Sequence, residues 1–276
     1  MTLNIEDFAN GAPASSSIGS IDEYLVETDY PSPIDAYVLH SRSLLKYGTA
    51  DRLTENEYLG GLLLLGSVSA AEAYFRSILS LTLEVCPICR QVSAEKQINL
   101  GGALWHGHAE FRRSAFEHMS FSSKEELKKA TRQFIRFELR DAKFKGPLDQ
   151  FEMVCHLRHG LVHNGGTLPG RNAVQIEAKT YSKPVRINVS FGLLQRTVEA
   201  VDTLVLTLNR ELFAEMCKRW AVDWRQRADW DPSTENRAFR KLWSAFASNE
   251  LIGARTGRSA FSRSQCMSQV RDYYNL

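Results

Sequence analysis

The chain has 276 residues, of which 34 are basic and 32 acidic, giving a formal net charge of +2, and 43% of its residues are hydrophobic. This composition is ordinary for a soluble globular protein. The length allows one sizeable core with modest extensions, or two small domains. The near balance of charge excludes neither nucleic acid nor a small molecule as a partner, because partners are selected by local patches.

The cysteines and the apolar segments indicate a cellular compartment. Five cysteines are an odd number, which favours free thiols in a reducing cytosol over a disulfide framework. The N-terminal segment lacks the basic start and apolar centre of a signal peptide. The most apolar run, residues 59–75, is interrupted by Glu72 and is shorter than the ~20 residues that span a bilayer. We therefore expect a soluble, cytoplasmic protein without a membrane partner.

The first half of the chain predicts a flexible lead-in followed by helices. Residues 1–33 are rich in Ser, Gly, Ala and Pro, and a short helix is expected over 34–47. A strongly apolar helix is predicted from about 54 to 85, with Thr54 and Glu57 as a capping box and Pro87 after its end. Its apolar residues surround most of the circumference, which is typical of a helix at the centre of a bundle.

Further along, helical spacing is expected over 101–121 and in a charged helix from 122 or 123 to about 144. Gly146-Pro147 predicts a break, and a helix then runs over 148–163. Apolar residues alternate in 174–178 and 185–191, which indicates a β-hairpin, and helical spacing returns over 193–222 and 234–248. The predicted fold is an all-α bundle with one small β-hairpin before the last long core helix. Its expected divisions are an extension (1–33), a helical domain (34–222) and a helical, basic C-terminal extension (223–276).

The helix over 148–163 has the most unusual side chains. Arg158 falls within its apolar arc, and an arginine that faces a core is costly unless it is paired. The nearest candidate partner is Glu72, so one interpretation is a structural ion pair with exposed histidines. The other interpretation is a proton-transfer site, because His156, His159 and His163 lie close to Arg158 and imidazole titrates near neutral pH.

These residues resemble a known family. The segment RHGLVH (158–163) is similar to the motif of the HEPN superfamily, in which a histidine follows an arginine after four to six residues. The segment SAAEAYF (69–75) resembles the pattern of the preceding core helix in several HEPN families. The resemblance covers roughly residues 35–220. One departure is His159, because many active members have Asn or Asp directly after the arginine.

The resemblance implies a metal-independent endoribonuclease without a cofactor, acting as a homodimer with a composite active site in a defence or toxin system. His163 would act as general base on the ribose 2′-hydroxyl, and Arg158 would hold the scissile phosphate. The products would be a 2′,3′-cyclic phosphate and a 5′-hydroxyl. Glu72 would orient Arg158, with His159 and Asn164 as further supporting residues. The implied partners are RNA, a second copy of the chain, and an antitoxin or other defence protein.

The positions of the two key residues give an independent reason for a dimer. On a straight helix Arg158 and His163 are about 140° apart, so one copy does not easily aim both at one phosphate. A second subunit or local unwinding at Gly160 would solve this.

Three alternatives remain open. The first is a non-catalytic, HEPN-like interaction module. The second is a zinc site built from Cys86, Cys89, His106 and His108, although a lone C-x-x-C with H-x-H is not the usual spacing. The third concerns the charged helix, where Arg132 and Arg136 could track RNA, whereas their mixture with acidic residues favours a solvated face.

Overall fold

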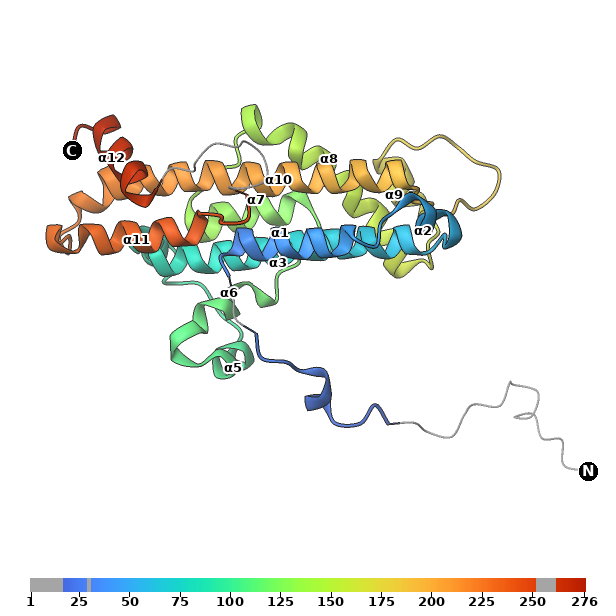
Figure 1. Cartoon of the computed structure of the whole chain (residues 1–276), viewed down its shortest axis with the longest axis horizontal. Coiled ribbons are helices and arrows are strands. Elements are labelled where there is room, and N and C mark those ends of the chain that lie inside the picture. Colours follow the sequence, from blue (N-terminus) through green and yellow to red (C-terminus); the bar gives the residue numbers. More distant parts are fainter. Residues whose placement is uncertain (1–16, 29–30, 252–261) are drawn as a thin grey trace, which may run out of the picture. The chain divides into compact units, whose positions relative to one another are not determined.

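The structure is a computed structural model that describes residues 17–28, 31–251 and 262–276. The chain divides into two compact units, Met1–Tyr30 and Pro31–Leu276. The described part of the first unit contains one short 3-10 helix, η2 (Ile21–Tyr24), which begins at the capping side chain of Ser20. The longer helices belong to the second unit (Figure 1).

The second unit is helical, and no β-strand occurs among its described residues. The α-helices are α1 (Pro33–Leu45), α2 (Ala50–Glu55), α3 (Leu59–Val85), α4 (Pro87–Val92), α5 (Leu100–Glu110), α6 (Ser114–Glu117), α7 (Lys124–Ile135), α8 (Asp141–His163), α9 (Gly170–Gln175), α10 (Phe191–Lys218), α11 (Glu235–Phe246) and α12 (Arg263–Tyr273). Short 3-10 turns connect some of them: η3 (Phe111–Arg113), η5 (Trp224–Gln226) and η6 (Pro232–Thr234). A π-helical turn, η4 (Arg219–Asp223), continues α10. The all-α class is thus confirmed.

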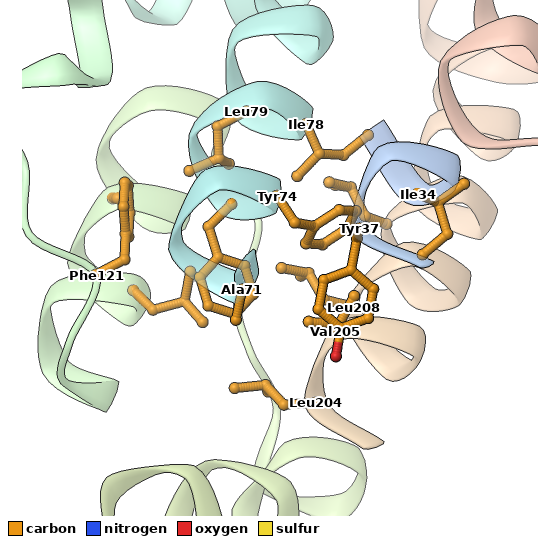
Figure 2. Packing of buried hydrophobic residues seen from close by; sticks show 14 of the residues in the cluster. Ile34, Tyr37, Ala71, Tyr74, Ile78, Leu79, Phe121, Leu204, Val205 and Leu208 are labelled. Carbon is orange, nitrogen blue, oxygen red and sulfur yellow. The ribbon is translucent and has the colours of Figure 1, made fainter. Parts of the chain in front are cut away.

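Helix α3 is at the centre of the core, as its apolar circumference predicts. It packs against α1, α8, α10 and α11. Figure 2 shows Tyr37 of α1, Tyr74 of α3 and Leu208 of α10 meeting around this helix, and all three side chains are buried. A helix that is apolar on all sides is stabilised when neighbours cover every face.

Helix α3 also has the length and hydropathy of a membrane-spanning segment, because it continues ten residues beyond the apolar run that ends at Phe75. In its most apolar window, however, 56% of the residues are buried inside the protein. Length and composition alone are shared by bilayer-spanning helices and by the core helices of water-soluble bundles.

The predicted starts of α3 and α8 are wrong. The apolar helix begins at Leu59 rather than near Thr54, which belongs to α2. Helix α8 begins at Asp141 and continues through Pro147 without a break. An internal proline costs about 3 kcal/mol, and burial of Phe144 and Leu148 on either side of it offsets that cost.

The charged helix ends nine residues earlier than predicted. Helix α7 stops at Ile135 because Arg136 adopts a left-handed conformation (φ 48°). The N–H of Phe137 then donates to the carbonyl of Thr131 at 3.0 Å, which completes a helix-ending turn. Arg219 donates to the carbonyls of Ile135 (2.8 Å) and Arg136 (2.9 Å). A distant side chain therefore fixes this end.

The predicted β-hairpin is not present. Val174 lies in α9 and is 78% exposed, so the first alternating segment has no buried face. The second segment is extended, but it lies beside the residues that follow α8: Leu168 donates to Val185 (2.9 Å) and Ile187 donates to Gly166 (2.8 Å). These bonds flank a single antiparallel bridge. Val189 is buried, so the second segment packs against the helices instead of pairing with the first segment.

Candidate functional site

Helix α8 ends at the predicted glycines. The N–H groups of Asn164 and Gly166 both donate to the carbonyl of Gly160 at 3.1 Å, and Thr167 donates to Asn164 at 2.9 Å. Gly165 (φ 58°) and Gly166 (φ 86°) have left-handed backbone conformations that glycine adopts at little cost. The turn reverses the chain, and residues 166–169 return along α8.

This return brings the chain into close contact with Gly160. A Cβ atom at Gly160 would lie 2.9 Å from the carbonyl oxygen of Thr167 and 2.6 Å from Cδ1 of Ile187. Only a glycine leaves this space free. Gly160, the third residue of the RHGLVH segment, is therefore required by packing, because it leaves room for the returning chain at Thr167 and for the side chain of Ile187.

A polar pocket of about 250 Å³ lies where α7, α8 and α9 come together. Arg158 and His159 line it, whereas His163 and Asn164 do not. The other lining residues are Ser122, Ser123, Glu152, Cys155, His156, Arg171, Asn172 and Gln175. The structure thus places two of the predicted site residues at one concave surface.

Arg158 is half-buried at this pocket and forms no ion pair or hydrogen bond with any residue that the structure describes. The expected partnership with Glu72 is wrong. Glu72 is only 8% exposed and accepts a hydrogen bond from Arg76, one helical turn away on α3, at 2.9 Å. The neighbour on the same helix is already close, so pairing with it requires little additional ordering. Arg158 therefore presents a guanidinium that has no ion-pair partner among the described residues.

The thiol of Cys155 also lines the pocket. Burial raises the pKa of this thiol well above its ordinary value, nearby Glu152 and Glu72 raise it further, and Arg158 lowers it. The thiol is therefore neutral, and a neutral thiol is a poor nucleophile. Cys155 contributes to the shape of the pocket rather than to chemistry.

His159 and His163 are exposed and contact each other. Their ring centroids are 4.8 Å apart, as expected for residues one turn apart on a helix. Because His159 lines the pocket, the two imidazoles form a continuous surface that runs from the pocket to the end of α8. Asn164 is exposed and ends the helix, and its N–H donates to Gly160.

Most of the residues that line the pocket were not among the predicted site residues. Asn172 of α9 and His156 of α8 are hydrogen-bonded (Nδ2 to Nδ1, 2.9 Å). Nε2 of His156 lies 3.9 Å from Oε1 of Glu152. The four-residue spacing of Glu152 and His156 is visible in the sequence, but Arg171 and Asn172 lie just before the predicted β-hairpin, where no pattern links them to this helix. Only the position of α9 brings them to the pocket.

No family model, curated protein or solved structure matches this chain. Membership of the HEPN superfamily, which the residues around Arg158 and His163 imply, therefore stays a prediction. Any function assigned to the chain must come from its own side chains.

The predicted zinc ligands do not come together. Cys86 and Cys89 are fully buried, and Nη1 of Arg219 donates to Sγ of Cys89 at 3.3 Å. His106 instead pairs with Glu117, and the side chain of His108 lies outside the described residues. Among those residues no group of three or more His, Cys, Asp or Glu is arranged to hold a metal ion. A guanidinium beside the thiols disfavours a second cation there.

The two thiols influence each other's ionisation. The hydrogen bond with Cys89 lowers the pKa of Cys86 to about 6, and the charge of Arg219 acts in the same direction against burial. The same hydrogen bond, together with burial, raises the pKa of Cys89 far above its ordinary value. The pair therefore releases one proton readily and keeps the other.

The two arginines proposed to track RNA have different environments. Arg132 pairs with Glu138 at 2.9 Å, and both side chains are more than half exposed. Arg136 ends α7, and its carbonyl accepts from Arg219. The geometry of Arg132 is that of a solvated surface ion pair, which contributes little to stability.

Proposed function

We propose that the protein is a metal-independent endoribonuclease of the HEPN type. The observation that supports this is the guanidinium of Arg158, which has no ion-pair partner among the described residues and lies in a polar pocket beside the contacting imidazoles of His159 and His163. A guanidinium binds phosphate through two parallel hydrogen bonds, and imidazole is the common general acid or base near neutral pH. Both groups needed for transfer at a phosphodiester are therefore on one surface.

In the proposed reaction, His163 removes the proton of the ribose 2′-hydroxyl, and the 2′-oxygen attacks the adjacent phosphorus. The bond from phosphorus to the 5′-oxygen breaks, and that oxygen takes up a proton from an imidazolium or from water. The products are a 2′,3′-cyclic phosphate and a 5′-hydroxyl. Arg158 offsets the negative charge that develops on the phosphate oxygens. No step requires a metal ion.

A homodimer is part of this proposal. His163 does not line the pocket that contains Arg158, so a single copy leaves the base at the rim. Two copies that pack through the ends of α8 would bring His163 of one to Arg158 of the other. RNA is the proposed substrate, and a defence or toxin role with an antitoxin or other partner protein in the cytoplasm follows from the resemblance to HEPN proteins.

The test is cleavage of total RNA by purified protein with EDTA present. We expect the wild-type protein to cleave and the Arg158→Ala and His163→Ala variants to cleave at least about 100-fold more slowly. His40→Ala, which removes an exposed histidine on α1, is the matched control and should cleave normally. Full cleavage by His163→Ala would refute the proposed mechanism, and the cyclic phosphate end would be identified by mass spectrometry.

The second candidate is a non-catalytic interaction module. Met153 and Val162 favour it, because both are apolar, 45% exposed, and located on α8 with the motif. In that case the helix would serve association alone. A Val162→Asp variant that loses self-association, from a wild-type protein that never cleaves RNA, would support the module over the nuclease.

A further inference from the structure

The pocket contains a second arginine that the proposed mechanism does not use. Arg171 of α9 lines the pocket together with Arg158, is exposed, and forms no ion pair with any residue in the described part of the chain. Two guanidiniums around one small cavity repel each other unless an anion lies between them. The pocket therefore has the charge of an anion site.

The single acidic residue of the pocket can offset only one of the two positive charges, and it forms no ion pair with either arginine among the described residues. Oε2 of Glu152 accepts the backbone N–H of Lys124 at 2.6 Å, and Oε1 faces His156. The carboxylate is thus committed to joining α8 to α7. The hydroxyls of Ser122 and Ser123 and the amides of Asn172 and Gln175 carry no charge and are suited to hydrogen bonding with oxygen atoms.

The position of Arg171 is fixed through its neighbour. Asn172 is 8% exposed, and its amide is hydrogen-bonded to His156. With Glu152 and the N–H of Lys124, these groups form a chain of polar contacts that links α9, α8 and α7 along the pocket wall. Because Arg171 directly precedes Asn172 in α9, this chain holds the backbone from which the guanidinium of Arg171 extends to the pocket.

We propose that the pocket binds one backbone phosphate of RNA next to the scissile phosphate, with Arg171 as a binding residue and Asn172 as a positioning residue. This proposal rests on the proposed RNA substrate but not on cleavage. The pocket, at about 250 Å³, is smaller than the cavities that enclose whole drug-sized ligands, so it suits a single group of a longer chain. The guanidinium of Arg171 suits a phosphate, because it can bind two of its oxygens, while Arg158 beside it holds the scissile phosphate.

The test measures binding without chemistry. Fluorescence anisotropy measures how tightly the full-length protein binds a labelled RNA oligonucleotide. All 2′-hydroxyls of this RNA are methylated, so that it cannot be cleaved. We expect Arg171→Ala to weaken binding about tenfold and to reduce the salt dependence by about one phosphate contact. Arg240→Ala is the control, since it removes an exposed arginine of α11 that does not line the pocket. Arg171→Lys should restore part of the affinity because it restores the charge.

The role of Asn172 is tested in a double-mutant cycle. If Asn172 acts by positioning Arg171, then Asn172→Ala weakens binding, but the double variant binds no more weakly than Arg171→Ala. Additive losses would show that Asn172 does not act through Arg171. Native circular dichroism of each variant is confirmed first.

The outcomes separate this proposal from the nuclease. An Arg171→Ala protein that binds the analogue as well as Arg240→Ala overturns the phosphate subsite, even if the wild type cleaves ordinary RNA. A wild-type protein that never binds the analogue also overturns it, and leaves a protein partner as the ligand of this surface. Binding that depends on Arg171, with no cleavage of ordinary RNA, keeps the subsite and refutes the nuclease.

Discussion

The carboxylate of Glu152 on α8 accepts the backbone N–H of Lys124, the first residue of α7, with Oε2 and N 2.6 Å apart. The first N–H groups of a helix have no partner within the helix, so acceptors from elsewhere stabilise its start. Ser123 satisfies another of these groups, the N–H of Glu126. One carboxylate therefore fixes the start of α7 and one wall of the candidate site.

We expect Glu152→Ala to lower the free energy of unfolding by about 1–2 kcal/mol, because it removes this charged acceptor from a helix N-terminus. Urea denaturation followed by circular dichroism measures the change. Glu95→Ala, at an exposed carboxylate without a hydrogen bond among the described residues, should change the free energy of unfolding by less than about 0.5 kcal/mol. Equal stability of the two variants would mean that the contact contributes nothing.

Arg219 is expected to be among the most important charged residues for stability. It is buried and donates to Glu215, to two carbonyls at the end of α7 and to Cys89. We expect Arg219→Met to cost about 3 kcal/mol, because it leaves buried acceptors unpaired. Arg210→Met, which removes an exposed ion pair with Glu211, should cost less than about 1 kcal/mol. Chemical denaturation of both variants decides whether burial makes this difference.

Gly160→Ala should destabilise the protein by about 1–2 kcal/mol, although alanine favours helices more than glycine. The added Cβ would meet the carbonyl of Thr167, which belongs to the backbone and moves only if the returning segment moves. Gly192→Ala in α10 is the control, since nothing lies within 4 Å of its added Cβ, and it should keep stability or raise it by up to about 1 kcal/mol. In thermal melts, the midpoint of Gly160→Ala should fall below that of the wild type, whereas the midpoint of Gly192→Ala should stay the same or rise.

The thiol pair predicts a dependence of stability on pH. The pKa of Cys86 is lowered from 9.0 to about 6 in the folded protein. Between these values the unfolded chain holds a proton that the folded protein has lost, so the free energy of unfolding should rise as pH increases from 6 to 9. Above pH 9 the free energy of unfolding should fall again. The pKa of Cys89 is raised in the folded protein, so its thiol stays protonated there while it loses its proton in the unfolded chain.

The measurement is urea unfolding under reducing conditions at several pH values. Cys86→Ser should remove the rise between pH 6 and 9, since serine does not ionise there. Cys266→Ser, at a thiol that is not part of the pair, should retain it. A rise that persists unchanged in Cys86→Ser would assign the effect to other groups.

The sequence alone determined the elements whose signals are local. The apolar circumference of α3 and the repeating spacing of α10 predict buried helices, because each pattern reports the burial of that helix itself. Gly165 and Gly166 end α8 as predicted, since the left-handed conformation is a property of those residues. Arg158 and His159 were expected to lie close together because they are neighbours on one helix.

Tertiary structure decided everything that depends on a choice between competing partners. Glu72 was expected to pair with Arg158 but pairs with Arg76, and α8 passes through Pro147 because burial on both sides outweighs a lost hydrogen bond. The segment around Asn172 forms a short helix, and the extended segment around Arg186 lies beside the residues that follow α8 instead of pairing with it. Local sequence sets which face of an element is apolar. Which neighbour covers that face depends on which of several distant contacts is the most stable. For that reason Arg171 reaches the pocket only in the folded chain.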